Sequence, residues 1–322
     1  MRPLGAAITA ALLALIAGRA ASAEDYPARP VRVLTGFPPG GVTDVIGRVL
    51  VDTLSSRLGQ PFHLEGKPGG AGNLAGELLA NAPADGYTLY LVGMGTAVIN
   101  HALYGTMTYD PATAFAPVTL LVRMPLILEV AARVPVASYR DFVAYVHSGA
   151  RLNHGSPGIG TLPHLAATLL EDKLGFQSTH VAYRGTGPYT AAMMQNEVEW
   201  SFDVPSATLA LLNAHAVRAL AVTAAARYPA FPDVPSVVEL GAGDLVIDTW
   251  FGLVAPARTP RAIVGRISET VAHGFAEPAA AARLRQLGFE PATTTPDETA
   301  AIFAADRARW SAVVTEHHIK AE

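Results

Sequence analysis

The stretch GFPPGGVTD at residues 36–44 lies between an apolar run, VRVLT at 31–35, and a segment whose apolar residues recur at helical spacing over 43–58. This order predicts a β-strand, a glycine-rich turn and an α-helix. Two prolines stiffen the turn, and two glycines allow a ligand to approach its main chain. Because the first N–H groups of a helix have no intrahelical partner, the turn is a candidate site for a carboxylate or a phosphate.

A second unit of the same kind occurs at residues 154–161, where HGSPGIGT follows a predicted strand at 152–154 and opens a predicted helix over 162–174. It offers the same backbone amides and adds the hydroxyls of Ser156 and Thr161. Neither loop contains the lysine of a phosphate-binding P-loop, so a carboxylate is the favoured ligand. The alternative is that both loops are only tight turns. Their recurrence favours binding, because ligands of open α/β sheets lie beyond the carboxyl ends of the strands.

Short apolar runs alternate with helical patterns through the rest of the chain, which is typical of α/β proteins with parallel sheets. The further predicted strands are 62–64, 87–92, two strands within 115–130, 180–183, 200–203, 219–223 and 249–255. The further predicted helices are 73–80, 138–148, 189–195, 261–276, 279–287 and 297–316. No repeat of roughly 20 to 50 residues is visible, which disfavours a solenoid.

Two series of strands and helices, followed by a C-terminal return, predict two α/β lobes joined by crossing strands. We expect residues 24–124 and 247–322 to form lobe 1 and residues 125–246 to form lobe 2. The chain has 322 residues, of which 50% are hydrophobic. It is therefore long and apolar enough for two domains, each with its own core.

Residues 1–23 are typical of a cleavable export signal. Arg2 provides a positive charge, residues 4–17 an apolar stretch, and Ala21-Ser22-Ala23 a small-residue cleavage site. The apolar stretch is too short for a transmembrane helix, which needs about 20 residues. We therefore expect a periplasmic protein that is soluble after cleavage near Ala23.

Composition excludes several classes of function. The chain has no cysteine, so disulfides, thiolate catalysis and thiolate metal sites are excluded. The net charge of −4 and the lack of a basic run argue against nucleic-acid binding. His154 and His164 have neither the spacing nor the acidic neighbours of a standard metal site, so we expect no metal and no cofactor.

Further motifs occur in a fixed order around the two glycine-rich loops. They are YPARPVR at 26–32, KPGGAGN at 67–73, PADGYTL at 83–89, VAYRG at 181–185, LAVT at 220–223, FPDVPS at 231–236 and WFGL at 250–253. With the two loops, this series resembles the Bug receptors, the extracytoplasmic solute-binding subunits of tripartite tricarboxylate transporters. The resemblance covers almost the whole mature chain. It implies a Venus-flytrap fold in which each lobe holds one side of a ligand carboxylate.

The resemblance also implies binding residues and partners. The implied ligand-binding residues are Phe37, Gly40, Gly41 and Thr43 in lobe 1, Ser156, Gly160 and Thr161 in lobe 2, and Thr96 and Asp203 at positions that often line the cleft. The ligand would be a dicarboxylate, an aromatic acid or an amino acid. A monomeric receptor would deliver it to the membrane permease subunits of such a transporter, or present it to a sensor protein.

Two features of the sequence make it less safe to infer the identity of the ligand from the family. Asp203 stands at a predicted strand end, where an acid would repel a dicarboxylate but attract an amino group. Alternatively, Asp203 caps or braces the hinge. MMQNEVE at 193–199 and Glu65-Gly66 also stand where the family usually carries other residues.

An enzyme is the rival class. Ser156, His164 and Asp203 suggest a periplasmic hydrolase, but no G-x-S-x-G motif occurs, and Pro157 removes an N–H that an oxyanion hole would use. A structural or adhesive periplasmic protein is a third class, and it predicts no stabilisation by small molecules. We therefore expect a solute receptor without catalytic activity.

Overall fold

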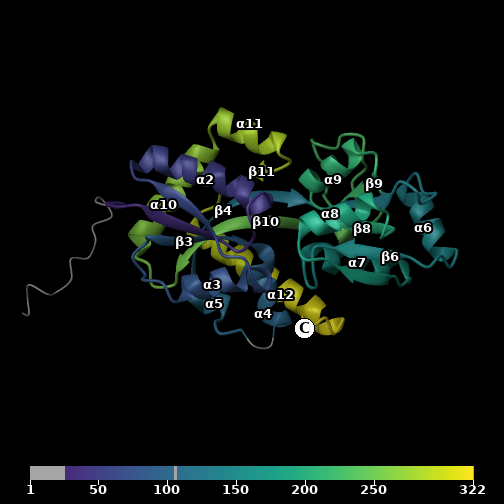
Figure 1. Ribbon diagram of the computed structural model, residues 1–322, viewed down its shortest axis with the longest axis horizontal. Coiled ribbons are helices and arrows are strands. Elements are labelled where there is room, and N and C mark those ends of the chain that lie inside the picture. The colour runs from purple at the N-terminus through teal and green to yellow at the C-terminus, as the bar shows by residue number, and fades with distance from the viewer. Residues whose placement is uncertain (1–25, 105–106, 322) are drawn as a thin grey trace, which may run out of the picture.

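The computed structural model describes residues 26–104 and 107–321, so the predicted export signal lies outside the described residues. The described chain forms two α/β lobes side by side, and strands β4 (Phe115–Pro125) and β10 (Asp248–Pro256) run between them (Figure 1). The predicted two-lobed α/β fold is confirmed. Below, lobe 1 denotes the elements around a six-stranded sheet and lobe 2 those around a five-stranded sheet.

Lobe 1 is built on a sheet with the strand order β11-β4-β10-β3-β1-β2. Its remaining strands are β1 (Val31–Thr35), β2 (Phe62–Gly66), β3 (Thr88–Gly93) and β11 (Glu290–Pro291). Strand β1 pairs in parallel with β2 and β3, whereas β10 is antiparallel to β3 and β4. The sheet is therefore mixed rather than parallel as the pattern predicted, because β10 returns from lobe 2 in the direction opposite to β3.

Helices cover both faces of this sheet. They are α2 (Val42–Leu58), α3 (Asn73–Ala80), α4 (Asn100–Leu103), α5 (Pro111–Ala114), α10 (Arg261–Phe275), α11 (Pro278–Gln286) and α12 (Pro296–Glu316). Figure 1 shows α2, α10 and α11 on one side and α3, α5 and α12 on the other. Helix α2 buries an apolar stripe that includes Ile46 and Leu50, and it ends at Gly59, whose left-handed backbone lets its N–H bond Ser55 O at 3.1 Å.

Two short turns at the ends of strands were not predicted. A 3₁₀ turn, η2 (Gly70–Gly72), follows β2, and a π-helical turn, η3 (Gly95–Ile99), follows β3 and runs directly into α4. Such π-helical turns are rare and frequently occur at functional sites. Both turns lie at the same edge of the sheet as the first glycine-rich loop, since β1, β2 and β3 are parallel.

Lobe 2 has the strand order β7-β6-β8-β5-β9. Its strands are β5 (Ile127–Ala131), β6 (Asn153–Ser156), β7 (Thr179–Ala182), β8 (Trp200–Asp203) and β9 (Val217–Val222). Its helices are α6 (Tyr139–His147), α7 (Leu162–Leu174), α8 (Thr186–Met194) and α9 (Pro205–Asn213). Strand β6 is parallel to β7 and β8, and β5 is antiparallel to β8 and β9. In the described part of the chain, no helix is long and apolar enough to cross a membrane.

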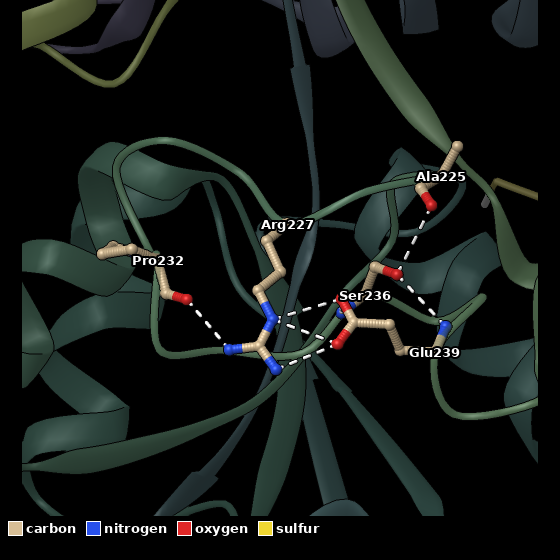
Figure 2. A network of polar contacts seen from close by, with 5 residues as sticks. All are labelled: Ala225, Arg227, Pro232, Ser236 and Glu239. Carbon is tan, nitrogen blue, oxygen red and sulfur yellow. Dashed lines mark hydrogen bonds and ion pairs between the residues drawn. The ribbon is translucent and has the colours of Figure 1, made fainter.

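A long connection from β9 to β10 leads the chain back to lobe 1 through the 3₁₀ turn η4 (Gly243–Leu245). Figure 2 shows the network that holds this connection together. The Arg227 guanidinium donates to both carboxylate oxygens of Glu239 and to Pro232 O, and Ser236 Oγ accepts from Glu239 N at 3.2 Å. The limits of the two lobes along the chain stay a prediction.

Candidate ligand-binding site

The two glycine-rich loops stand at the carboxyl ends of strands in different lobes. Loop 1, residues 36–41, follows β1 and opens α2, and loop 2, residues 156–161, begins at the last residue of β6 and opens α7. At their N-caps, Gly41 and Thr161, no side chain bonds the first turn. By contrast, Ser138 and Thr295 cap α6 and α12 with their own hydroxyls. The first-turn amides of α2 and α7 therefore have no side-chain cap.

Loop 1 carries an exposed aromatic ring, and the first turn of α2 carries a buried hydroxyl without a partner among the described residues. Phe37 is 37% exposed, and Thr43 is 4% exposed with no hydrogen-bond partner for Oγ1 among the described residues. Gly40 has a left-handed φ of 87°, and its N–H donates to Asp44 Oδ2 at 3.1 Å. Asp44 is also paired with Arg48 at 3.2 Å. One predicted ligand amide, that of Gly40, is thus bound to a side chain of the same loop and helix.

The turn η2, after β2, packs against loop 1 and is itself held by side chains of β3 and of the turn η3. A β-carbon on Gly36 would overlap the Cα of Gly72, so only two glycines allow these backbones to pass so closely. The Tyr90 hydroxyl donates to Gly72 O at 3.0 Å, and the Thr96 hydroxyl donates to Ala71 O at 3.0 Å. Thr96 is 2% exposed, so in this conformation its hydroxyl holds the η2 turn.

Loop 2 is held by hydrogen bonds among its own residues and to nearby histidines. The Thr161 hydroxyl donates to Gly158 O at 2.7 Å, and Ser156 Oγ accepts from Gly158 N at 3.2 Å. Ser156 Oγ also lies 2.7 Å from His180 Nε2. Gly160 N donates to His164 Nδ1 at 3.0 Å, so this predicted ligand amide is engaged as well.

Loop 2 also contacts lobe 1 directly. A β-carbon on Gly160 would overlap Cδ1 of Leu103, the last residue of α4. Since α4 continues from the π-helical turn η3, this contact brings the Gly160 loop against the segment that carries Thr96. Near the C-terminal end of α12, His317 Nε2 lies 3.0 Å from Asp172 Oδ2 on α7, which is a second bridge between the lobes. No hydrogen bond joins loop 1 to loop 2 within the described residues.

A hollow of about 400 Å³ lies beside loop 1 and is bounded by Phe37, Pro39, Asp44, Arg48 and His63, among others. All of its lining residues come from lobe 1, so it is not a pocket between the lobes.

Asp203 is placed inside lobe 2 rather than on an exposed wall. It is 1% exposed, Oδ1 accepts from Val204 N at 2.7 Å, and Oδ2 has no partner among the described residues. Burial raises the pKa of Asp203 well above its usual value, and the neighbouring Glu129 raises it further. Its predicted role in selectivity stays a prediction, but a carboxyl whose charged form is disfavoured by burial is a poor partner for a ligand ammonium.

Comparison with known proteins decides the family. A sequence model described as "Tripartite tricarboxylate transporter family receptor" matches residues 46–319. The chain belongs to this receptor family. The resemblance to the Bug receptors is thereby confirmed, because the receptor is also 30% identical to Protein BugT of Bordetella pertussis over 92% of its own length and 91% of that protein.

Solved structures of the same class agree. The receptor matches the structure described as "R. palustris Rpa4515 with adipate" with a TM-score of 0.86 and 34% identity, over 92% of this chain and 99% of that one. It matches "MatC (Rpa3494) from Rhodopseudomonas palustris with bound malate" with a TM-score of 0.80 and 31% identity, over 90% and 100%. The family consists of periplasmic solute-binding receptors, which are not enzymes.

The structure also brings together residues that the sequence did not connect. His180 of β7 joins His154 and His164, and one nitrogen from each ring lies within 4.8 Å of one nitrogen from each of the other two. Tyr90 and Asn100 hold the η2 turn of the receptor, and Asn100 Nδ2 donates to Asn73 Oδ1 at 2.7 Å. The glycines at 36 and 72 are the signal that could have indicated this support, since closely packed backbones need them.

Proposed function

We propose that the receptor captures a small dicarboxylate in the periplasm and delivers it to the permease subunits of a tripartite tricarboxylate-type transporter. Cleavage near Ala23 would release it there as a soluble protein. The observation that carries the proposal is the pair of helices, α2 and α7, whose first turns have no side-chain cap and which begin at glycine-rich loops in opposite lobes. Each helix N-terminus favours an anion by about 0.3–1 kcal/mol, and more when it is partly buried.

The proposed binding groups divide between the lobes. Phe37, Gly41 and Thr43 bind one ligand carboxylate from lobe 1, where Thr96 holds the adjoining η2 turn, and Ser156 and Thr161 complete the site from lobe 2 when the lobes close. Gly40 and Gly160, whose amides bond Asp44 and His164, shape the two loops. The unpartnered hydroxyl of Thr43 supports this arrangement, because a buried hydroxyl without a partner is costly in the free protein. A ligand that bonds both loops favours the closed form over the open form, and this difference drives closure.

A dicarboxylate is favoured over an amino acid by the charges near the loops. The Asp203 carboxyl is buried with its pKa raised well above the usual value, which disfavours its charged form, and the Asp44 carboxylate is already paired with Arg48. Neither side chain is available to bind a ligand ammonium. The adipate and malate bound to the two related receptors support the same class of ligand.

Calorimetry and thermal shift with adipate, malate, benzoate and glutamate test the proposal. A dicarboxylate at about 100 times its Kd should stabilise the receptor by about 2.7 kcal/mol. Ser156→Ala with Thr161→Ala, and separately Thr43→Val, should weaken binding, and circular dichroism should show that both variants are folded. The matched control is Thr270→Val, whose hydroxyl bonds only within α10. If no acid shifts the midpoint, or if the double variant binds as tightly as wild type, the proposal is wrong.

A further inference from the structure

Three nearly parallel imidazole rings lie together beside loop 2. His154 of β6 and His180 of β7 are register partners, and their ring centroids lie 4.8 Å apart at an interplanar angle of 13°. His164, in the first turn of α7, stacks on His180 with centroids 3.8 Å apart at 11°. His154 and His164 also lie near each other, with centroids 6.1 Å apart. The strands and the helix therefore bring three residues from separate parts of the chain into one compact histidine cluster.

Hydrogen bonds connect this histidine cluster to loop 2 and, through Ser178, to the acid Glu171. His164 Nδ1 accepts from Gly160 N at 3.0 Å, and His180 Nε2 lies 2.7 Å from Ser156 Oγ. His154 Nδ1 lies 2.7 Å from Ser178 Oγ, and Ser178 in turn donates to Glu171 Oε1. Of the two loop residues that the histidine cluster contacts, Ser156 is a proposed ligand-binding residue, and Gly160 fixes the backbone of the loop beside it.

The geometry of the histidine cluster disfavours a metal site, although three histidines suggest one. Imidazole nitrogens bind a metal in the plane of the ring at about 2.0–2.1 Å, so His164 and His180, which are stacked with centroids 3.8 Å apart, cannot both direct a lone pair to one ion. His164 has a second obstacle, because its Nδ1 accepts from Gly160 and its Nε2 must then carry the proton. His154 Nε2 is buried and has no hydrogen-bond partner among the described residues, but a single free nitrogen does not make a metal site.

We propose that His164 and His180 are positioning residues that hold loop 2 in its binding shape, and that they can do so only as neutral imidazoles. Protonation of His164 at Nδ1 would convert the acceptor for Gly160 N–H into a donor and break that bond. Protonation of His180 would place a positive charge between two other rings. The choice of a dicarboxylate as the ligand rests on the proposed function, whereas the neutral state of the two histidines does not depend on it.

The surroundings keep the two rings neutral. Burial lowers the pKa of His164 to about 3, and His180 and His154 lower it further. Burial likewise lowers the pKa of His180 to about 4, His154 adds to this, and Glu171 acts in the opposite direction. Trp200 on β8, whose ring is tilted against His154 with centroids 5.1 Å apart, carries no charge. Loop 2 should therefore keep its shape down to about pH 5.

Substitutions of His164 separate the hydrogen bond from the packing. His164→Asn retains an acceptor near the position of Nδ1 but cannot be protonated in this range, whereas His164→Leu has a similar volume and no acceptor. We expect His164→Leu to raise the Kd for the dicarboxylate by about tenfold or more and His164→Asn to stay within about threefold of wild type. Equal affinities for His164→Leu and wild type would overturn the proposal.

The pH profile provides a readout that packing alone would not change. The ligand has its own titration, and this is common to wild type and to the double variant His164→Asn/His180→Gln. The Kd of wild type divided by the Kd of the double variant should be constant from about pH 7 to pH 5. This ratio should then rise as the pH falls toward 3.5, because only wild type loses the loop 2 contacts when its histidines are protonated. A ratio that stays constant throughout, with both proteins folded by circular dichroism, would overturn the proposal.

Nuclear magnetic resonance tests the chemistry without any ligand. Long-range ¹H–¹⁵N spectra at about pH 5 should show His164 and His180 neutral, with His164 protonated at Nε2. A protonated ring at that pH, or stoichiometric Zn²⁺ binding that shifts all three histidines, would overturn the inference. If the spectra are as expected but no carboxylate binds, it is the proposed function that fails.

Discussion

Leu103 of lobe 1 lies against Gly160 of loop 2 so closely that a β-carbon on Gly160 would overlap Leu103 Cδ1. This contact lies between the segment that carries Thr96 and the loop that carries Ser156, so it couples the two halves of the candidate site. Gly160 also has a φ of 72°, which favours glycine. The contact with Leu103 and the positive φ thus both favour glycine at position 160.

Two alanine substitutions distinguish these restrictions. Gly160→Ala and Gly40→Ala both place a β-carbon at a positive φ, which costs about 1 kcal/mol. At Gly40 nothing lies within 4 Å of the new atom, whereas at Gly160 the new methyl meets Leu103. We therefore expect the larger loss of unfolding free energy for Gly160→Ala in urea titrations. Addition of Leu103→Ala should recover part of the extra loss, and strict additivity of the two changes would contradict a contact.

The free energy of unfolding should depend on pH because Glu129 is buried and its pKa is therefore raised. Glu129 is 0% exposed, accepts from the Tyr189 hydroxyl at 2.8 Å, and has its pKa raised to about 7, chiefly by desolvation. The folded protein therefore binds more protons than the unfolded chain between about pH 4.5 and 7. The free energy of unfolding that Glu129 contributes is present below this window and is lost as the pH rises through it, by up to about 1.4 kcal/mol per unit.

Glu129→Gln should remove this dependence while keeping an acceptor for Tyr189. The variant and wild type should have similar stability near pH 5, and the variant should be the more stable near pH 8. The difference between the two proteins is the quantity to measure, because His164 and His180, whose pKa values are lowered, contribute the opposite slope. Parallel curves of unfolding free energy against pH would contradict the assignment.

Asp306 on α12 accepts a hydrogen bond from the indole N–H of Trp250, a buried tryptophan of β10. Trp250 is 0% exposed, stacks on Phe303 with centroids 4.5 Å apart, and donates from Nε1 to Asp306 Oδ2 at 2.7 Å. Asp306→Ala leaves this N–H without a partner and should cost about 1–3 kcal/mol in chemical denaturation. Asp306→Asn, which keeps an acceptor, should cost clearly less, and equal losses would indicate that the hydrogen bond is unimportant.

The sequence predicted the elements that carry the site better than the state of the groups on them. The helix predicted over 162–174 is α7 residue for residue, and that predicted over 43–58 begins one residue earlier, at Val42. Both have clear boundaries, since a glycine-rich loop precedes each helix and a left-handed glycine ends it. Helix α9 was missed because Pro205 starts it directly after β8, with no loop between them.

What the sequence could not predict are contacts made across the fold. His180 meets His154 only because β7 and β6 pair in one register, and Leu103 meets Gly160 only because the lobes come together. The amide of Gly160 was predicted to face a ligand, yet His164 occupies it. A periodic pattern predicts helices and strands, but it does not predict which of several nearby acceptors a given N–H will bond.

The connection between β9 and β10 allows a buried and an exposed polar contact to be compared in one network (Figure 2). Ser236 is 0% exposed and receives Glu239 N at 3.2 Å, whereas the Arg227 and Glu239 side chains are 47% and 42% exposed. Ser236→Ala should cost about 1 kcal/mol of unfolding free energy at any salt concentration. Arg227→Met should cost less, and its effect should vanish in about 1 M NaCl, where exposed charges are screened. Urea titrations of both variants at low and high salt measure this, and a salt-independent loss for Arg227→Met would mean that the Arg227 contact with Pro232 O, rather than the ion pair, holds the connection.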